Sequence, residues 1–134
     1  MDWRISRGEL RMKCRRLFMR YDLEERTGKF GENVIRFCKN LLTDTVTKPI
    51  VSQLVRSATS IGANYMEANG ASSKKDFRNK IFICKKESQE TLHWLRMLLV
   101  CYPVQSSSIV GLRKECEELT LIFGKIVSSI RTDG

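Results

Sequence analysis

The sequence predicts an all-α fold, an antiparallel up-down-up-down four-helix bundle over residues 21–134. Three observations predict it: apolar residues recur at helical spacing in four segments, turn signals separate those segments, and no segment alternates as a strand does. The chain has 134 residues, which fits one domain, and 42% of them are hydrophobic, enough for a sizeable core. Long helices with short links pack as antiparallel neighbours.

The first helix is expected to begin at Asp22 and to end near Thr43. Asp22 and Glu25, three residues apart, resemble a capping box. The apolar residues that follow at helical spacing are Phe30, Val34, Phe37 and Leu41. A turn over residues 43–47 is expected next.

The second helix is expected to begin at Thr47 or Lys48, with Pro49 in the first turn, where a missing N–H costs nothing. Asn69 and Gly70 predict its end. Its apolar stripe comprises Ile50, Leu54, Ala58, Ile61, Tyr65 and Ala68. Its polar flank is either a solvated face or a site of close helix approach; this flank comprises Gln53, Ser57, Ser60, Asn64 and Glu67.

The third and fourth helices have equally clear limits. The third helix is expected to begin after Ser73, which caps it together with Asp76, and to run to about Cys101. Its expected core face comprises Phe77, Ile81, Cys84, Ser88, Leu92, Leu95 and Leu99. The fourth helix is expected to begin near Ser107 or Ser108. Its apolar positions are Ile109, Leu112, Cys116, Leu119, Phe123, Ile126 and Ile130.

The chemistry-bearing residues predict neither an enzyme nor a metal protein. The chain has five cysteines without a CxxC pair, and its one histidine is His93; the cysteines are Cys14, Cys38, Cys84, Cys101 and Cys116. We interpret them as free thiols in a reducing cytoplasm rather than as a disulfide framework. Glu90 and His93 match the Glu-x-x-His motif once, whereas a di-metal site in a helix bundle needs additional glutamates and Glu-x-x-His motifs on facing helices. No cofactor is expected, and no apolar stretch is long enough to span a membrane.

The formal net charge of +9 is concentrated in two places. Residues 1–20, a basic N-terminal arm, carry seven basic and two acidic side chains, and residues 74–86 carry six and one, so each segment has a net charge of +5. The rest of the chain sums to −1. Such clustering favours a polyanionic partner, and the alternative is a solubilising surface. Met12 and Met19 are alternative start positions within the arm.

On a helical wheel, the third helix has two further faces beside its core face. One is basic, with Phe82 among its members, and comprises Lys74, Lys75, Arg78, Lys85, Lys86 and Arg96. Together with Arg15 and Arg16 of the arm, this face is the expected nucleic-acid-binding surface, because lysine and arginine displace the cations condensed on phosphates.

The other face combines large apolar residues with carboxylates and comprises Ile83, Glu87, Glu90, Trp94 and Met97. A helix of a monomeric bundle usually has a single apolar stripe. We interpret this second stripe as a subunit interface, and the alternative is a core that is wide at this point. The two carboxylates would need basic partners if they were buried.

Three segments carry a resemblance to a known family: YDLEERTGKFGENVI (21–35), LVRSATSIGANYMEAN (54–69) and KKDFRNKIFICKKESQETLHWLRML (74–98). They resemble the four-helix-bundle proteins encoded in intervening sequences of bacterial 23S ribosomal RNA genes, and the match covers residues 21–131. The combined signature comprises Ser60, Ile61, Asn64, Glu67, Ala68, Asp76, Phe77, Lys86, Glu87, Ser88, Glu90, Thr91, Trp94 and Leu95. The basic arm departs from the shorter start usual in that family.

The resemblance implies a ring-like homopentamer and kinship with the accessory variability proteins of diversity-generating retroelements, which bind reverse transcriptase and nucleic acid. It implies no catalytic residues. The leading hypothesis is therefore a non-catalytic oligomer that binds RNA. The alternatives are an adaptor that docks a reverse transcriptase or another nucleic-acid enzyme and, less favoured, a membrane-surface role of the arm, where Trp3, Ile5, Leu10, Leu17 and Phe18 interleave with basic residues.

Overall fold

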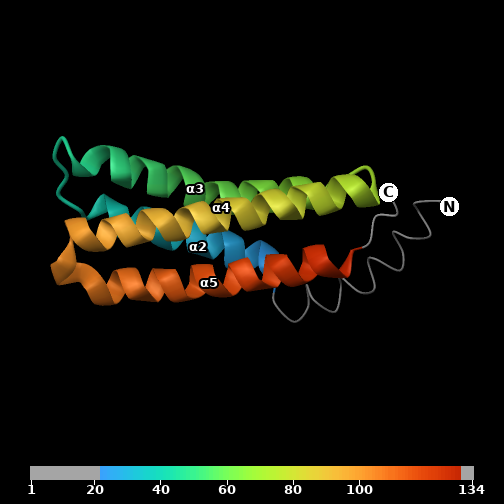
Figure 1. Cartoon of the computed structure of the whole chain (residues 1–134). Coiled ribbons are helices and arrows are strands. Elements are labelled where there is room, and N and C mark those ends of the chain that lie inside the picture. The colour runs from blue at the N-terminus through green and yellow to red at the C-terminus, as the bar shows by residue number, and fades with distance from the viewer. Residues whose placement is uncertain (1–21, 131–134) are drawn as a thin grey trace.

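The computed structural model describes residues 22–130, which form four α-helices packed along one another (Figure 1). They are α2 (Leu23–Lys39), α3 (Thr47–Asn69), α4 (Lys74–Cys101) and α5 (Ser106–Ser129), and the short 3₁₀ helix η1 (Pro103–Gln105) precedes α5. The described residues contain no strand. The prediction of an all-α fold with four packed helices is confirmed. The basic arm, with Arg15 and Arg16, lies outside the described residues.

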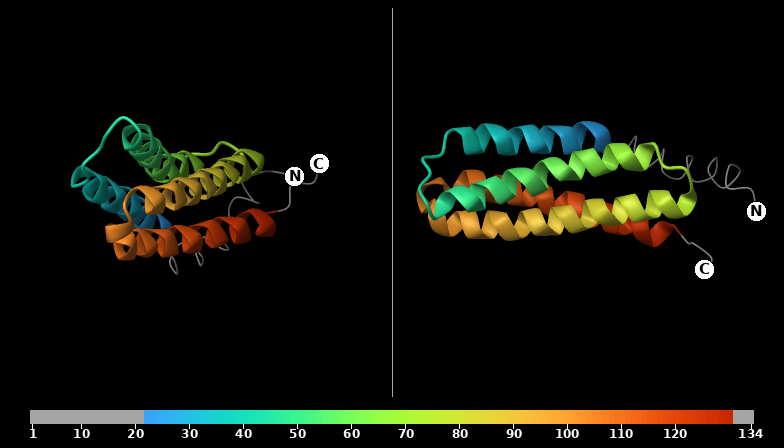
Figure 2. Two further views of the ribbon diagram at one scale, coloured as in Figure 1. Left: turned by 60° about the vertical axis from the view of Figure 1, so that its left-hand side comes forward. Right: turned by 90° about the horizontal axis from the view of Figure 1, so that it is seen from above.

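The links between successive helices lie at alternating ends of the bundle (Figure 1). The α2–α3 and α4–α5 links share one end, and the α3–α4 link lies at the other. The helix α4 packs against both α3 and α5, whereas α2 packs mainly on α3 and meets α5 more sparingly (Figure 2). Arg26 of α2 reaches α5 through a two-pronged ion pair with Glu115, at 2.6 and 3.1 Å.

The start of α2 corrects one prediction. The helix does begin directly after Asp22, whose carbonyl accepts the N–H of Arg26 at 2.9 Å. However, Asp22 has a left-handed backbone (φ 45°, ψ 60°), and its side chain caps no amide. A capping box needs an extended residue at this position, so the prediction of one with Glu25 was wrong. Aspartate tolerates the left-handed region better than most residues do.

The helix α2 also ends earlier than Thr43. After Lys39, the side chain of Asn40 donates to the carbonyl of Arg36 at 3.2 Å and so satisfies one of the free carbonyls of the last turn. Further along the link, the Asp44 carboxylate accepts the N–H groups of Val46 and Thr47, both at 2.9 Å, and these bonds lower the pKa of Asp44. They also provide the start of α3 with acceptors.

The start of α4 agrees with the sequence, but its buried face is shifted. The Ser73 Oγ accepts the N–H of Asp76 at 3.0 Å, as predicted. Leu92 and Leu99, however, are half-buried rather than core residues, and Thr91 and Leu98 are fully buried instead. The reason is that α4 packs closely against α3, which turns its buried arc toward that helix.

The helix α5 begins at Ser106, directly after η1 and slightly before the expected position. None of the described helices is by itself long and apolar enough to cross a membrane. By length and composition, α4 and the segment Pro103–Ser129 pass that test only as a pair, and the pair is bent by 119° at its break.

The core lies between the four helices and includes Phe30, Leu54, Ile81, Leu95 and Phe123, all at most 1% exposed. It also holds a few hydroxyl groups that bond across helices. Thr91 Oγ1 of α4 donates to Ser57 Oγ of α3 at 2.9 Å, and Thr120 Oγ1 of α5 donates to Ser88 Oγ at 3.0 Å. Buried hydroxyls paired in this way avoid the cost of an unmade hydrogen bond.

The described cysteines are free thiols, as the sequence predicted. Cys38, Cys84 and Cys116 are buried, and Cys101 is half-buried. Burial raises the pKa of Cys38 to about 11 and those of Cys84 and Cys116 to about 12. These three thiols are therefore core groups rather than nucleophiles, because the thiolate is the reactive form. Cys14 lies outside the described residues.

Candidate nucleic-acid interface

The predicted basic residues of α4 lie on the side of that helix that borders α5 and the surface. Lys75, Lys86 and Arg96 are exposed, and Lys74, Arg78 and Lys85 are half-buried. Five of the six lie within residues 74–86. Arg96 follows ten residues after Lys86, about 15 Å further along the helix axis. The structure thus brings five cations into one cluster, and Arg96 extends the same face.

None of these six side chains forms an ion pair with a described residue. Other cations of the bundle differ in this respect. Lys80, on the opposite side of α4, contacts Glu67 at 2.9 Å, and Arg113 of α5 contacts Glu117 at 3.1 Å. The positive charge of the basic face is consequently not neutralised by the part of the chain that the structure describes.

Two of the six cations are held by α5. Arg78 Nε donates to the carbonyl of Ile130, just after the end of α5, at 3.2 Å. The side chain of Lys85 passes Gly124, where a Cβ would lie 3.8 Å from Cε and 3.9 Å from Nζ. The bond to Ile130 orients the Arg78 side chain and leaves its two terminal nitrogens available. Ordering of this kind reduces the entropy that a ligand contact would otherwise cost.

The predicted interface stripe lies on the α3 side of α4. Its members Ile83, Glu87, Glu90, Trp94 and Met97 are all half-buried. Trp94 packs against the core, so the wide-core interpretation accounts for part of the stripe. The side chains still reach the surface, which leaves the interface a prediction.

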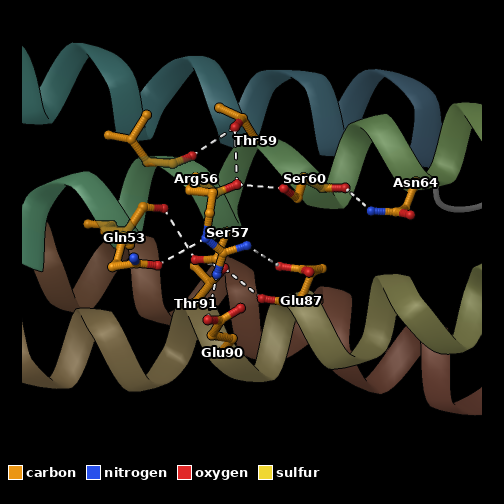
Figure 3. A network of polar contacts seen from close by, with 11 residues as sticks. Gln53, Arg56, Ser57, Thr59, Ser60, Asn64, Glu87, Glu90 and Thr91 are labelled. Atoms are coloured by element: carbon orange, nitrogen blue, oxygen red, sulfur yellow. Dashed lines mark hydrogen bonds and ion pairs between the residues drawn. The ribbon is translucent and has the colours of Figure 1, made fainter.

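Both carboxylates of the stripe share a cation that the sequence analysis missed (Figure 3). Arg56 of α3 binds Glu90 through Nη2 at 2.5 Å and Glu87 through Nη1 at 3.4 Å, and its Nε donates to Gln53 at 2.9 Å. Burial raises the pKa of Glu87, whereas the hydrogen bond from Arg56 lowers that of Glu90. A signal for this contact existed: beyond the first turn of α3, Arg56 is its one basic residue.

Trp94 carries the one buried side-chain polar atom that lacks a hydrogen-bond partner among the described residues, its indole Nε1. The indole lies near Glu90 and contributes to the low pKa of that carboxyl. The indole also meets His93 edge-on, with the ring centroids 4.9 Å apart.

The polar flank of α3 divides between the two interpretations offered for it. Ser57 is fully buried and bonded to Thr91, so close helix approach is confirmed there. Gln53 and Glu67 are exposed. Asn64 is half-buried but donates to the carbonyl of Ser60 in its own helix, at 2.8 Å (Figure 3).

A shallow, mainly apolar groove of about 340 Å³ separates α2 from α3 on the outer surface. Its lining includes Gly28, Gly31 and Gly62, and Glu24 and Glu32 contribute carboxylates. Its lining contains no histidine, cysteine or serine. Over residues 22–130, no group of three or more His, Cys, Asp or Glu side chains could hold a metal ion.

Comparison with known proteins places this geometry in context. A family model described as 23S rRNA-intervening sequence protein matches residues 21–125. A comparison with curated proteins gives no match. A crystal structure from Bacteroides thetaiotaomicron, described as a protein with unknown function from the S23 ribosomal protein family, is 29% identical with a TM-score of 0.69. The match covers 82% of this chain and 99% of that one.

Proposed function

The chain belongs to the 23S rRNA-intervening sequence protein family, and from this premise we propose that it is a non-catalytic, oligomeric protein that binds RNA through the basic face of α4. In this proposal the four helices follow an antiparallel up-down-up-down course, which the alternating ends of the helix links support (Figure 1). The subunits form a ring-like homopentamer in the cytoplasm, without a cofactor.

One observation carries the proposal: six basic side chains share one side of α4, and none has an ion-pair partner among the described residues. Like charges held close together repel one another, and a bound polyanion offsets the cost of that repulsion. A nucleic acid gains affinity from such a surface by releasing the cations condensed on its phosphates. The contacts expected here are to the RNA backbone, which favours recognition of structure over sequence.

A ring would add to the affinity of each subunit. The stripe around Trp94 supports an assembly, because its large apolar side chains are half-buried and still reach the surface. Each subunit of a ring would present the same basic face. Once one face has bound a long RNA, the others bind as though the RNA were locally concentrated, which raises the overall affinity.

The binding experiment uses the full chain and fragments of 23S ribosomal RNA, in filter binding over a range of salt concentrations. If the six cations of one subunit all contact phosphates, the slope of log K against log salt should be about −4 for single strands and about −5 for duplexes. A protein that binds no RNA even at low salt would contradict the proposal. The adaptor role, with docking to a reverse transcriptase or a similar enzyme, would then replace it.

The assembly experiment measures the mass of the purified chain by light scattering. We expect about five times the 15.5 kDa of one chain. Trp94→Glu and Met97→Glu should each lower that mass, because a carboxylate would be forced into a desolvated contact. Val100→Glu is the matched control, since Val100 lies on the same helix at 80% exposure and outside the stripe. A monomeric wild type at micromolar concentration, or folded variants that keep the full mass, would refute the interface.

A further inference from the structure

Phe82 is an exposed aromatic residue at the centre of the basic face. It is 46% exposed, and it is the one aromatic side chain among the exposed large hydrophobic residues of the described chain. The core therefore does not account for its size. An exposed aromatic ring set among cations is the combination with which proteins bind single-stranded nucleic acid, because the ring stacks on a base and the cations contact phosphates.

The neighbours of Phe82 are cations. Arg78 and Lys86 lie four residues before and after it, and Lys85 lies three residues after it, which are the spacings at which side chains on a helix adjoin. None of the three forms an ion pair with a described residue. An aromatic ring between free cations matches a nucleotide, which offers a flat base and a phosphate together.

Of the cations nearest α5, Arg78 is also oriented before any ligand binds. Arg78 is tied through Nε to the Ile130 carbonyl, which leaves its two terminal amino groups free to grip a phosphate or a base edge. The end of the Lys85 side chain lies beside Gly124, where a Cβ would come within 3.8 Å of Cε and 3.9 Å of Nζ, so the absence of a side chain leaves room for the ammonium at the border of α4 and α5. The phosphates of an RNA strand that runs between α4 and α5 would thus meet these cations on the α5 side of Phe82.

We propose that Phe82 stacks on an unpaired RNA base while Arg78 and Lys85 bind the adjoining phosphates. This inference rests on the proposed function and specifies its ligand as single-stranded or bulged RNA. In a duplex both faces of each base are covered by its neighbours, so an aromatic side chain reaches a base only where the strand is unstacked. Stacking on one base contributes between about 5-fold and about 150-fold in affinity.

The test compares a fluorescent single-stranded RNA with a blunt duplex of the same sequence, by anisotropy with the full chain. Phe82→Ala should weaken single-strand binding by roughly tenfold and leave duplex binding unchanged, whereas Phe82→Tyr keeps a ring and should bind as the wild type does. Val100→Ala is the matched truncation, because Val100 is an exposed apolar residue at the same angular position of α4, five turns along.

Salt provides a second readout that separates stacking from charge. Phe82→Ala should lower affinity by the same factor at every salt concentration and leave the slope of log K against log salt unchanged, since no phosphate contact is lost. Single-stranded RNA should quench the tryptophan fluorescence of the Phe82→Trp variant more than that of the wild type. RNA binding by the wild type without an effect of Phe82→Ala would overturn the stacking inference alone. No RNA binding by the wild type would overturn the proposed function as well.

Discussion

Reversing Lys75, Arg78 and Lys86 to glutamate is expected to abolish binding to ribosomal RNA fragments at physiological salt. Each reversal removes one cation from the unneutralised cluster of α4 and adds a charge that repels phosphate. Loss of three phosphate contacts alone would reduce the magnitude of the slope of log K against log salt by about 2 to 3. Filter binding measures the affinity, and circular dichroism and light scattering establish that helicity and mass are retained.

The control for this variant separates the local cluster from the total charge. Three reversals, of two charges each, lower the net charge from +9 to +3 in either protein. The matched variant reverses Lys29, Lys48 and Lys125, which are exposed on α2, α3 and α5. It should keep most of the affinity. Equal losses in the two variants would mean that RNA responds to net charge, and an unaffected triple variant on α4 would refute the interface.

Replacing Phe123 by alanine should lower the free energy of unfolding by about 3–5 kcal/mol. Phe123 lies in α5 with none of its surface exposed, and it is among the largest fully buried side chains of the core. Truncation removes its apolar contacts and leaves a cavity that the surrounding helices fill only in part. Urea denaturation should show a lower midpoint with an unchanged dependence on denaturant.

The control is Leu121→Ala, two residues earlier on the same helix, where the side chain is 67% exposed. Its effect should stay within about 0.5 kcal/mol, as for most surface substitutions. Both variants must be compared at one protein concentration, because assembly would couple to unfolding. A Phe123→Ala protein as stable as the wild type would mean that Phe123 does not lie in the core.

The triple reversal on α4 and Phe123→Ala act on separate parts of the molecule. Phe123 belongs to the buried side of α5, whereas the basic face of α4 is turned toward solvent. The triple reversal on α4 should lose RNA binding and keep its stability, whereas Phe123→Ala should lose stability and keep every cation. These two results together would show that the core holds the basic face in place and does not itself contact RNA. Distant sites that share no partners usually contribute independently.

The sequence alone predicted the helices and the basic face because both depend on local spacing. Residues three and four apart adjoin on any helix, so the cluster from Lys74 to Lys86 follows once that segment is helical. The start of α4 was equally predictable, since the bond between Ser73 and the Asp76 amide spans a single turn. At the start of α2 the same reasoning failed, because the backbone of Asp22 is left-handed.

Only the tertiary structure decided which side of each helix is buried and which charges meet. Arg56 pairs with Glu87 across 31 residues, and Arg78 bonds to Ile130 across 52. Such contacts depend on how far each helix rotates about its axis and slides along its neighbour, and helical periodicity leaves both undetermined. Side-chain packing fixes them, because neighbouring helices interlock only at certain angles. That is why Thr91 and Leu98 are buried in place of Leu92 and Leu99, and why the two carboxylates beside Trp94 share the guanidinium of Arg56.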